Sequence, residues 1–235
     1  MGGADLIQID GKQPIIFCDF DGTITLNDNI IALMKHFNPA GWEDLLEELL
    51  AGRKSLKATV GEMFALFPSE QKQEIQAYVL DNAGIREGFT ELLAYCKQSN
   101  IPFLVTSGGI DFFIYPILAP FDIKSDHIYC NFSNFEGAYI EILWPNPCDD
   151  HCHNECGMCK TRIIREYSRD TYYRILIGDS LTDFEGSKIV DLVFARSHLL
   201  ERCLETNLRH KSYETFFDVL EHLNAITAHS ESHSS

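Results

Sequence analysis

Three short apolar segments of this chain each stop at a polar loop that carries glycine, and this pattern constrains the fold more than any other feature. The segments are residues 14–18, 102–106 and 173–177, and amphipathic helical segments separate them. Short apolar runs of this kind are typical of strands that are buried on both faces of a parallel sheet. Strands that alternate with helices therefore predict an α/β fold with a doubly wound parallel sheet.

Residues 27–82 follow a helical pattern throughout and contain no strand pattern. Their apolar side chains recur at helical spacing in four successive segments, which proline and glycine residues separate. We therefore expect a small helical cap (27–82) inserted after the first strand of a core formed by residues 1–26 and 83–228. The last residues, 229–235, are rich in serine and histidine and are expected to form a disordered tail.

The formal net charge of −16 limits the partners that this chain can bind. An acidic surface repels the phosphate backbone, which argues against a nucleic-acid partner. It also repels anionic metabolites, so a phosphate site needs a local metal ion, a buried lysine and backbone N–H groups. We find no apolar stretch long enough to cross a bilayer and no secretion signal in the first ten residues, so we expect no membrane partner and a cytoplasmic location.

Asp19 and Asp21 come directly after the first predicted strand. Because side chains alternate along an extended chain, the two carboxylates lie on the same side of it. Two neighbouring carboxylates repel each other unless one keeps its proton or a cation binds between them, and Mg²⁺ prefers such oxygen ligands. The pair by itself is equally compatible with a polar turn after a strand.

The other strand ends and one helix start carry further polar candidates. Ser107 and Gly108 follow the second strand and offer a hydroxyl and backbone N–H groups to an anion. Asp179 lies in the loop after the third strand, and Asp183 lies in the first turn of the next helix. Lys160 begins a helix, where a cation is misplaced unless an anion holds it. Taken singly, residues 107–109 are better interpreted as a turn, Asp183 could be a helix cap, and a solvated surface is the commoner place for a lysine such as Lys160. Parallel strands, however, bring their carboxyl ends to one edge of the sheet.

In this order, the candidates resemble the four motifs of the haloacid dehalogenase superfamily of phosphatases. The motifs are Asp19-Phe20-Asp21-Gly22-Thr23, Ser107, Lys160, and Gly178-Asp179-Ser180 with Asp183. The cap between the first and second motifs resembles the phosphoserine-phosphatase branch. The resemblance implies a Rossmannoid core and a Mg²⁺-dependent phosphatase that works through an aspartyl-phosphate.

The resemblance also implies a role for each motif residue. Asp19 would attack phosphorus, and Asp21 would protonate the leaving oxygen and then deprotonate water. Asp183 would act through a metal-bound water or by orienting Lys160. The ligands of Mg²⁺ would be Asp19, the backbone carbonyl of Asp21, and Asp179. The phosphoryl oxygens would be held by Ser107, the N–H of Gly108, and Lys160.

Residues 85–89, 107–113, 128–131 and 148–160 are similar to those of a phosphatase of methionine salvage, which implies a small phosphorylated metabolite as the partner. A phosphoserine- or phosphocholine-type phosphatase stays an alternative, because charged cap residues could bind an amino-acid substrate; these are Glu43, Arg53 and Lys54. A non-catalytic binding module is the alternative of another class, and the complete motif set argues against it. A homodimer stays open.

Two sets of side chains are candidate substrate contacts. Arg86 lies where the chain returns from cap to core, where related phosphatases often place a substrate contact; a salt-bridged hinge is the competing interpretation. Apolar cap residues could receive an apolar substrate end, although burial in the cap core is the commoner fate of such residues. These residues are Met34, Phe37, Met63 and Phe64.

Four of the eight cysteines lie within a polar loop, residues 148–159, which we call the cysteine loop. They are Cys148, Cys152, Cys156 and Cys159. Four soft ligands this close together could hold a structural Zn²⁺. Their spacing is not the usual pair of C-x2-C motifs, so disulfides and free thiols stay open. The other cysteines are scattered through apolar segments, where we expect small core residues.

Overall fold

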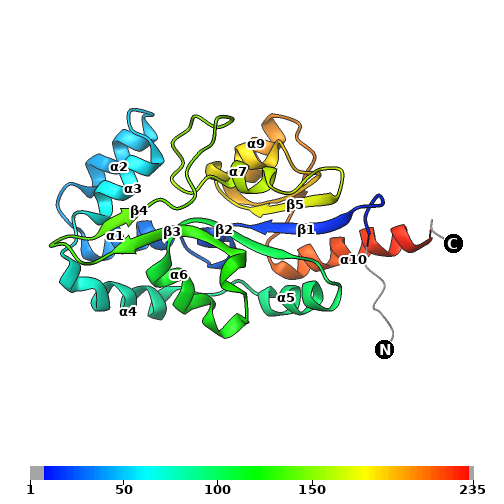
Figure 1. The fold of residues 1–235 in the computed structure, drawn as a ribbon, viewed down its shortest axis with the longest axis horizontal. Helices are drawn as coiled ribbons and strands as arrows, with labels where there is room; N and C mark the ends of the chain where they lie inside the picture. The colour runs from blue at the N-terminus through cyan, green and yellow to red at the C-terminus, as the bar shows by residue number, and fades with distance from the viewer. Residues whose placement is uncertain (1–7, 233–235) are drawn as a thin grey trace.

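The centre of the protein is a seven-stranded sheet with the strand order β4-β3-β2-β1-β5-β6-β7 (Figure 1). The computed structural model describes residues 8–232. All neighbouring strands pair in parallel except β3 and β4, which form an antiparallel hairpin. The strands are β1 (Gln13–Cys18), β2 (Phe103–Ile110), β3 (Ile128–Asn134), β4 (Glu141–Leu143), β5 (Tyr172–Gly178), β6 (Leu192–Ala195) and β7 (Lys211–Ser212). The predicted α/β fold with a largely parallel sheet is confirmed.

Helices cover both faces of this sheet because β1 is apolar on both of its sides. Ile15 and Phe17 pack into a cluster with residues of α7, whereas Ile16 and Cys18 belong to the larger cluster on the opposite face. In Figure 1, α7 and α9 lie on one side of the sheet, and α5, α6 and α10 lie on the other. The core helices are α5 (Phe89–Gln98), α6 (Asp111–Leu118), α7 (Lys160–Arg165), α8 (Phe184–Ser187), α9 (Ser197–Glu205) and α10 (Phe216–Ser232).

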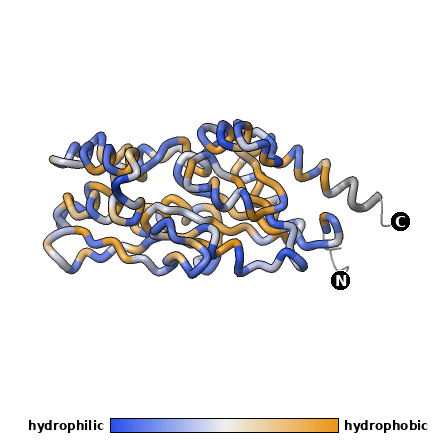
Figure 2. Tube along the Cα trace, turned by 90° about the horizontal axis from the view of Figure 1, so that it is seen from above, coloured by the Kyte–Doolittle hydropathy of each residue, from blue (hydrophilic) through white to orange (hydrophobic). Residues whose placement is uncertain are grey.

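Helix α10 buries one face on the core. Phe216, Val219 and Leu223 are fully buried at helical spacing. Figure 2 shows hydrophobic and hydrophilic residues alternating along this helix, as expected for an element that lies at the surface. The helix continues to Ser232, so the expected disordered tail (229–235) is wrong for residues 229–232. A helix that is already anchored extends at little cost per residue.

Four helices fill the segment that was expected to form a cap. They are α1 (Asn29–Phe37), α2 (Trp42–Leu50), α3 (Leu56–Phe64) and α4 (Lys72–Asn82), and they lie at the end of the molecule opposite both termini (Figure 1). The side chains of Asp28 and Ser55 cap the N-termini of α1 and α3. Thr25 and Ile85 form an antiparallel bridge, so the chain leaves and re-enters the core at one place. The division into cap and core domains stays a prediction.

Backbone hydrogen bonds hold these helices against the core. The Ile140 N–H donates to Phe67 at 3.0 Å, and the Ser69 N–H donates to Ala138 at 3.0 Å, beside the β3–β4 hairpin. The Lys57 N–H of α3 donates to Glu155 of the cysteine loop at 3.1 Å. Helix α3 therefore contacts the cysteine loop that leads to α7.

Two boundaries near the carboxyl edge of the sheet differ from the predicted ones. Strand β2 does not stop at Thr106 but continues to Ile110, with irregular pairing to β3 between these two residues. The helix expected after the third strand begins as a 3₁₀ turn (Leu181–Asp183), and the short helix α8 follows it. The Asp183 side chain turns back to cap Ser180, which explains the tight first turn.

Two further predictions concern the chain ends and the membrane. Residues 1–7, the start of the expected core and of the segment searched for a secretion signal, lie outside the described residues, as do residues 233–235. Between residues 8 and 232, none of the helices combines the length and the apolar character that a bilayer crossing requires.

Phe113→Ala should destabilise the protein by about 3–5 kcal/mol, because its fully buried ring on α6 would leave a cavity in the core. Phe132→Ala is the matched control, since that ring is 39% exposed, and should change stability by about 0.5 kcal/mol. Urea denaturation measures both free energies of unfolding. Equal losses in the two variants would contradict the core described above.

Candidate active site

The carboxyl edge of the three central strands brings the predicted polar residues together. Asp19 directly follows β1, and its N–H donates to Ile177 of β5 at 2.9 Å. The chain then turns sharply through Gly22, which has a φ of +75°. A Cβ atom on Gly22 would lie 2.4 Å from an Asp179 carboxylate oxygen. Glycine is therefore required here both by the backbone angle and by the close approach of β5's loop.

Lys160, the first residue of α7, places its ammonium between two buried carboxylates. Its Nζ lies 2.9 Å from Asp19 Oδ1 and also donates to Asp183 Oδ1. Each of these three residues is at most 5% exposed. Burial alone would lower the pKa of Lys160, but the carboxylates of Asp183 and Asp19 raise it above its ordinary value. Lys160 is therefore a permanent buried cation.

Asp183 also holds the loop after β5. Its Oδ2 accepts hydrogen bonds from the N–H groups of Asp179 and Ser180 at 3.3 and 3.2 Å. A Cβ atom on Gly178 would lie 2.5 Å from this carboxylate, so glycine allows Asp183 to fold back over the strand end. Asp183 is thus placed to orient Lys160. Its contact with a metal-bound water stays a prediction.

Asp19, Asp179 and Asp183 each offer a carboxylate oxygen within 4.8 Å of the others. Burial raises the pKa of Asp19 and of Asp179, and the neighbouring Asp183 carboxylate raises both further. Three carboxylates stand against the one ammonium of Lys160, which leaves an excess of negative charge in a buried site. A divalent cation with a preference for oxygen ligands fits this donor set.

Asp21 is anchored from the cap side. Its Oδ1 accepts from the backbone N–H and the side-chain Nδ2 of Asn29 at 3.1 and 2.6 Å. Its Oδ2 lies against Gly109, where a Cβ atom would be 2.7 Å away. Burial, together with repulsion from Asp28, raises the pKa of Asp21 to about 7. A carboxyl group with such a pKa exchanges protons readily at neutral pH.

Asn29 was not identified from the sequence. The only local signal is its place directly after Asp28, at the start of the first cap helix. Asn131 was missed as well, and its Nδ2 donates to the Gly108 carbonyl at 2.7 Å. Asn29 follows Asp21 by eight residues and Asn131 follows Gly108 by 23, and neither separation matches a turn or helix pattern that would indicate the contact.

The Ser107–Gly109 segment presents backbone to an open space. The Ser107 hydroxyl is buried and accepts the Gly109 N–H at 2.9 Å. Nothing lies within 4 Å of a Cβ atom built on Gly108. Gly108 instead lines a cavity of about 240 Å³ that also reaches Lys160. Two of the three predicted phosphate-binding residues, Gly108 and Lys160, therefore line one cavity, and Ser107 precedes Gly108 in the chain.

Apolar side chains from three different segments form part of the wall of this cavity. They are Leu56 of α3, Met158 of the cysteine loop, and Leu181 after β5. The polar and sulfur-bearing lining residues are Cys152, Asn154, Cys156, Thr161, Thr182 and Glu185. A small molecule with a phosphate at one end and an apolar group at the other matches this lining.

The apolar and charged cap residues considered from the sequence lie elsewhere. Met34, Met63 and Phe64 are buried in the main apolar cluster, and Phe37 packs at its edge. Arg53 pairs with Glu47, and Lys54 pairs with Glu48 and Glu62. These four apolar side chains therefore belong to the hydrophobic core and do not line the cavity.

Arg86 is buried at the junction of cap and core. Its guanidinium donates to the carbonyls of Gly22 and Thr23, both at 2.7 Å, and to Glu214 at 3.2 Å. These bonds hold the turn between Asp21 and Asp28 in place. The Arg86 guanidinium thus donates to backbone carbonyls in this structure. The substrate contact and the salt-bridged hinge that were considered for Arg86 both stay predictions.

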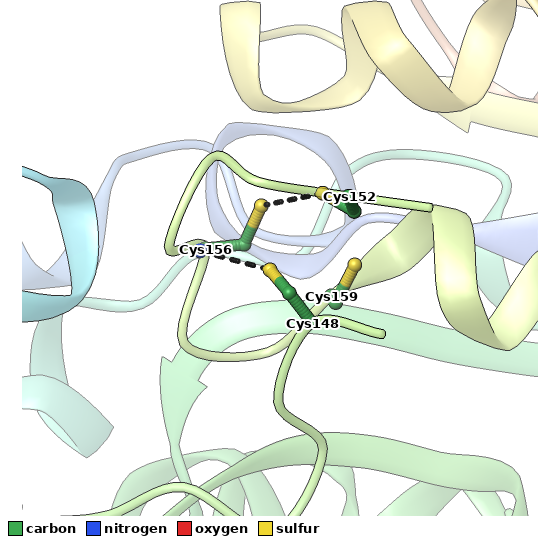
Figure 3. Close-up of side chains that lie close together, drawn as sticks. All are labelled: Cys148, Cys152, Cys156 and Cys159. Atoms are coloured by element: carbon green, nitrogen blue, oxygen red, sulfur yellow. Dashed lines mark hydrogen bonds between the residues drawn. The ribbon is translucent and has the colours of Figure 1, made fainter. Parts of the chain in front are cut away.

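A second cluster of potential metal ligands lies in the cysteine loop (Figure 3). The Sγ atoms of Cys148, Cys152, Cys156 and Cys159 lie within 4.8 Å of one another. All eight cysteines of the chain are free thiols. The disulfide alternative is therefore wrong for this structure: Cys152 Sγ and Cys156 Sγ, for example, are 3.8 Å apart, well beyond a covalent bond.

Comparison with known proteins places this geometry in a family context. A family model described as haloacid dehalogenase-like hydrolase matches residues 16–188. The chain is 50% identical to the 2-hydroxy-3-keto-5-methylthiopentenyl-1-phosphate phosphatase of Brevibacillus brevis, over 92% of this chain and 97% of the relative. It is also 50% identical to the protein of the same name from Bacillus pumilus, over 88% and 90% of the two chains.

A solved structure supports the fold independently. The structure of a probable phosphoserine phosphatase from Vibrio cholerae superposes with a TM-score of 0.72 at 15% identity, over 93% of this chain and 66% of that chain. At this identity the likeness shows the fold alone. It agrees with the strand order and the flanking helices described above.

Saturating Mg²⁺ should raise the melting temperature of the protein by about 5–10 °C, because a ligand that binds only the folded state stabilises it. Asp179→Asn removes one charge from the carboxylate group and should abolish most of this shift. Asp122→Asn is the matched control, since that side chain is 90% exposed and far from the site, and should keep the full shift. Differential scanning fluorimetry measures the shift in melting temperature with and without Mg²⁺ in each variant. A shift in Asp179→Asn equal to that of the unmodified protein would contradict the metal site.

Proposed function

Because the chain belongs to the haloacid dehalogenase-like hydrolase family, we propose that it is the phosphatase that hydrolyses 2-hydroxy-3-keto-5-methylthiopentenyl-1-phosphate to the acireductone in methionine salvage. The observation that carries this proposal is the buried Lys160 ammonium beside Asp19, at the end of a cavity that Gly108 lines with open backbone. Relatives with half of their residues identical over most of both chains support the substrate.

Asp19 is the nucleophile. Its Oδ1 is held by Lys160 and by the Phe20 N–H at 2.8 Å, so the orientation of the carboxylate is fixed. Attack on phosphorus gives an aspartyl-phosphate, which replaces one difficult hydrolysis with two easier steps. Ser107, the Gly108 N–H and Lys160 hold the phosphoryl oxygens as charge spreads over them in the transition state.

Asp21 is the acid and then the base. With a pKa raised to about 7 by burial, a substantial fraction of its carboxyl group is protonated at neutral pH. The proton passes to the enol oxygen that leaves phosphorus, and the same carboxylate later takes a proton from the water that cleaves the aspartyl-phosphate. Asn29 holds Oδ1, which leaves Oδ2 for this exchange.

Asp19, the backbone carbonyl of Asp21 and Asp179 would hold Mg²⁺ at this edge of the sheet. When bound, Mg²⁺ supplies positive charge that offsets the repulsion between the Asp19 carboxylate and the incoming phosphate. Asp179 is kept in place by the Thr23 hydroxyl, which donates to its Oδ1 at 2.9 Å. The Tyr213 hydroxyl in turn donates to the Thr23 hydroxyl at 3.4 Å.

The lining of the cavity favours an apolar substrate end over an amino-acid end. Leu56, Met158 and Leu181 suit the methylthio group, whose thioether is soft and apolar. In a phosphoserine- or phosphocholine-type enzyme, the charged end of the substrate needs opposite charges in the cavity. Arg53 and Lys54 are instead engaged in ion pairs with glutamates of the cap. A cytoplasmic location and a homodimer stay predictions.

Asp19→Asn should lower turnover of p-nitrophenyl phosphate by about 10³-fold or more, because the amide is not a nucleophile. The fold should survive, since the change removes one charge from a crowded carboxylate group and Asp183 still neutralises Lys160. Circular dichroism monitors the fold, and Asp122→Asn serves as the control with normal activity. A folded Asp19→Asn protein with near-normal turnover would overturn the assigned role.

The substrate is tested by comparing kcat/KM for several phosphate esters. The kcat/KM for enzymatically generated 2-hydroxy-3-keto-5-methylthiopentenyl-1-phosphate should exceed that for phosphoserine and phosphocholine by about 10²-fold or more. The charged ends of the latter two esters would find no partners at the apolar wall of the cavity. A preference for phosphoserine by a comparable factor would overturn the proposal of a salvage phosphatase. Absence of activity on both the salvage substrate and phosphoserine would overturn it as well.

A further inference from the structure

The segment between β4 and α7 needs something other than regular structure to hold it. Residues 144–159 contain neither helix nor strand, and long segments of this kind usually have a function. Most side chains of the cysteine loop from Asp150 to Glu155 are exposed, so few apolar contacts stabilise it. Yet this loop ends at Lys160, whose position must be accurate for phosphate binding.

The four thiols of the cysteine loop have the arrangement that one tetrahedral metal ion requires. In Figure 3 their sulfur atoms converge on one small space, and all four lie within 4.8 Å of one another. Zinc–sulfur bonds of about 2.3 Å in a tetrahedron place neighbouring sulfurs about 3.8 Å apart. Cys152 Sγ and Cys156 Sγ are 3.8 Å apart. Thiolate ligands in a tetrahedral set select Zn²⁺ over Mg²⁺, which prefers oxygen.

Neighbouring groups offer hydrogen bonds to the sulfur atoms. The Cys156 N–H points at Cys148 Sγ at 3.4 Å, and the Thr161 hydroxyl lies 3.3 Å from Cys159 Sγ. Donors of this kind offset the negative charge that four thiolates leave on a Zn²⁺ site and orient the ligands. Cys159 and Cys152 are buried, which protects two of the four sulfurs from solvent.

We propose that the four cysteines of this loop bind one structural zinc ion, which fixes the loop between the cap and the catalytic Lys160. Cys152 and Cys156 also line the cavity, so the ion stabilises part of the cavity wall. The same loop bonds to α3 through Glu155 and packs Gly157 against the Trp144 ring, where a Cβ atom would be 2.7 Å from that ring. Zinc binding itself does not rest on the proposed function; only its effect on substrate does.

The test is the metal content of the full-length protein purified without chelator. Elemental analysis should give about one zinc ion per chain. Cys148→Ser and Cys156→Ser should lose it, because each removes one ligand. Two variants should retain it: Cys203→Ala, which removes a buried cysteine outside the loop, and Asp179→Asn, which alters the acidic site instead. Loss of zinc in Asp179→Asn with retention in the serine variants would place the ion at the acidic site and overturn the proposal.

A second measurement on the unmodified chain covers the case in which the serine variants do not fold. Titration of wild-type protein with a mercurial thiol reagent should release zinc in proportion to the modification of four thiols, with a metallochromic dye as the readout. Replacement of zinc by Co²⁺ should give the intense visible and near-ultraviolet bands of a tetrahedral thiolate site. Four freely titrating thiols without zinc, iron in place of zinc, or disulfides by mass spectrometry would each overturn the proposal.

Zinc removal should also change catalysis in a defined direction. Chelator-treated protein with Mg²⁺ restored should lose about ten- to a hundred-fold in kcat/KM, because small displacements of Lys160 and of the cavity wall misplace the phosphate. Zinc added back should restore the loss. Zinc present at one ion per chain with no activity on any phosphate ester would refute the proposed function and leave the zinc site intact, so the two proposals fail separately.

Discussion

The ammonium of Lys160, buried between Asp19 and Asp183, is the interaction on which the rest of the site depends. It joins the end of β1, the loop after β5 and the start of α7. Removing Lys160 from this buried set would leave its carboxylates uncompensated, which is far costlier than the net gain from forming the ion pairs. Because Asp183 also binds the N–H groups of residues 179 and 180, the same ion pair sets the position of Asp179. The geometry of this edge therefore depends on one lysine.

The strand ends could be predicted because the physics that places them is local. The apolar runs that form β1 and β5 stop where the carboxylates begin, and parallel strands bring those ends to one edge. The positions of Asp19, Lys160 and Asp179 at the ends of strands and at a helix start were therefore enough to predict that the three side chains lie close together. The continuation of β2 through Gly109 was missed, since a glycine pair indicates a turn unless a neighbouring strand pairs with it.

Residues that act only through tertiary contacts could not be predicted from the sequence. Asn29 reaches Asp21 from a helix of the cap, and Asn131 reaches Gly108 from β3, so neither has a neighbour in the chain that reports its role. The apolar side chains that line the cavity could not be distinguished from core side chains for the same reason. A methionine at helical spacing in the cap, such as Met63, is equally suited to a core or a pocket, and only packing decides between them.

The bond between Asn29 and Asp21 divides the chemistry between two parts of the chain. The nucleophile Asp19 follows β1 and Lys160 begins α7, whereas the amide that holds the proton donor belongs to α1. A displacement of α1 would leave Asp19 and Lys160 in place but would release the Asp21 side chain from the amide that orients it. Accurate proton transfer therefore depends on the packing of a helix that carries none of the reacting groups.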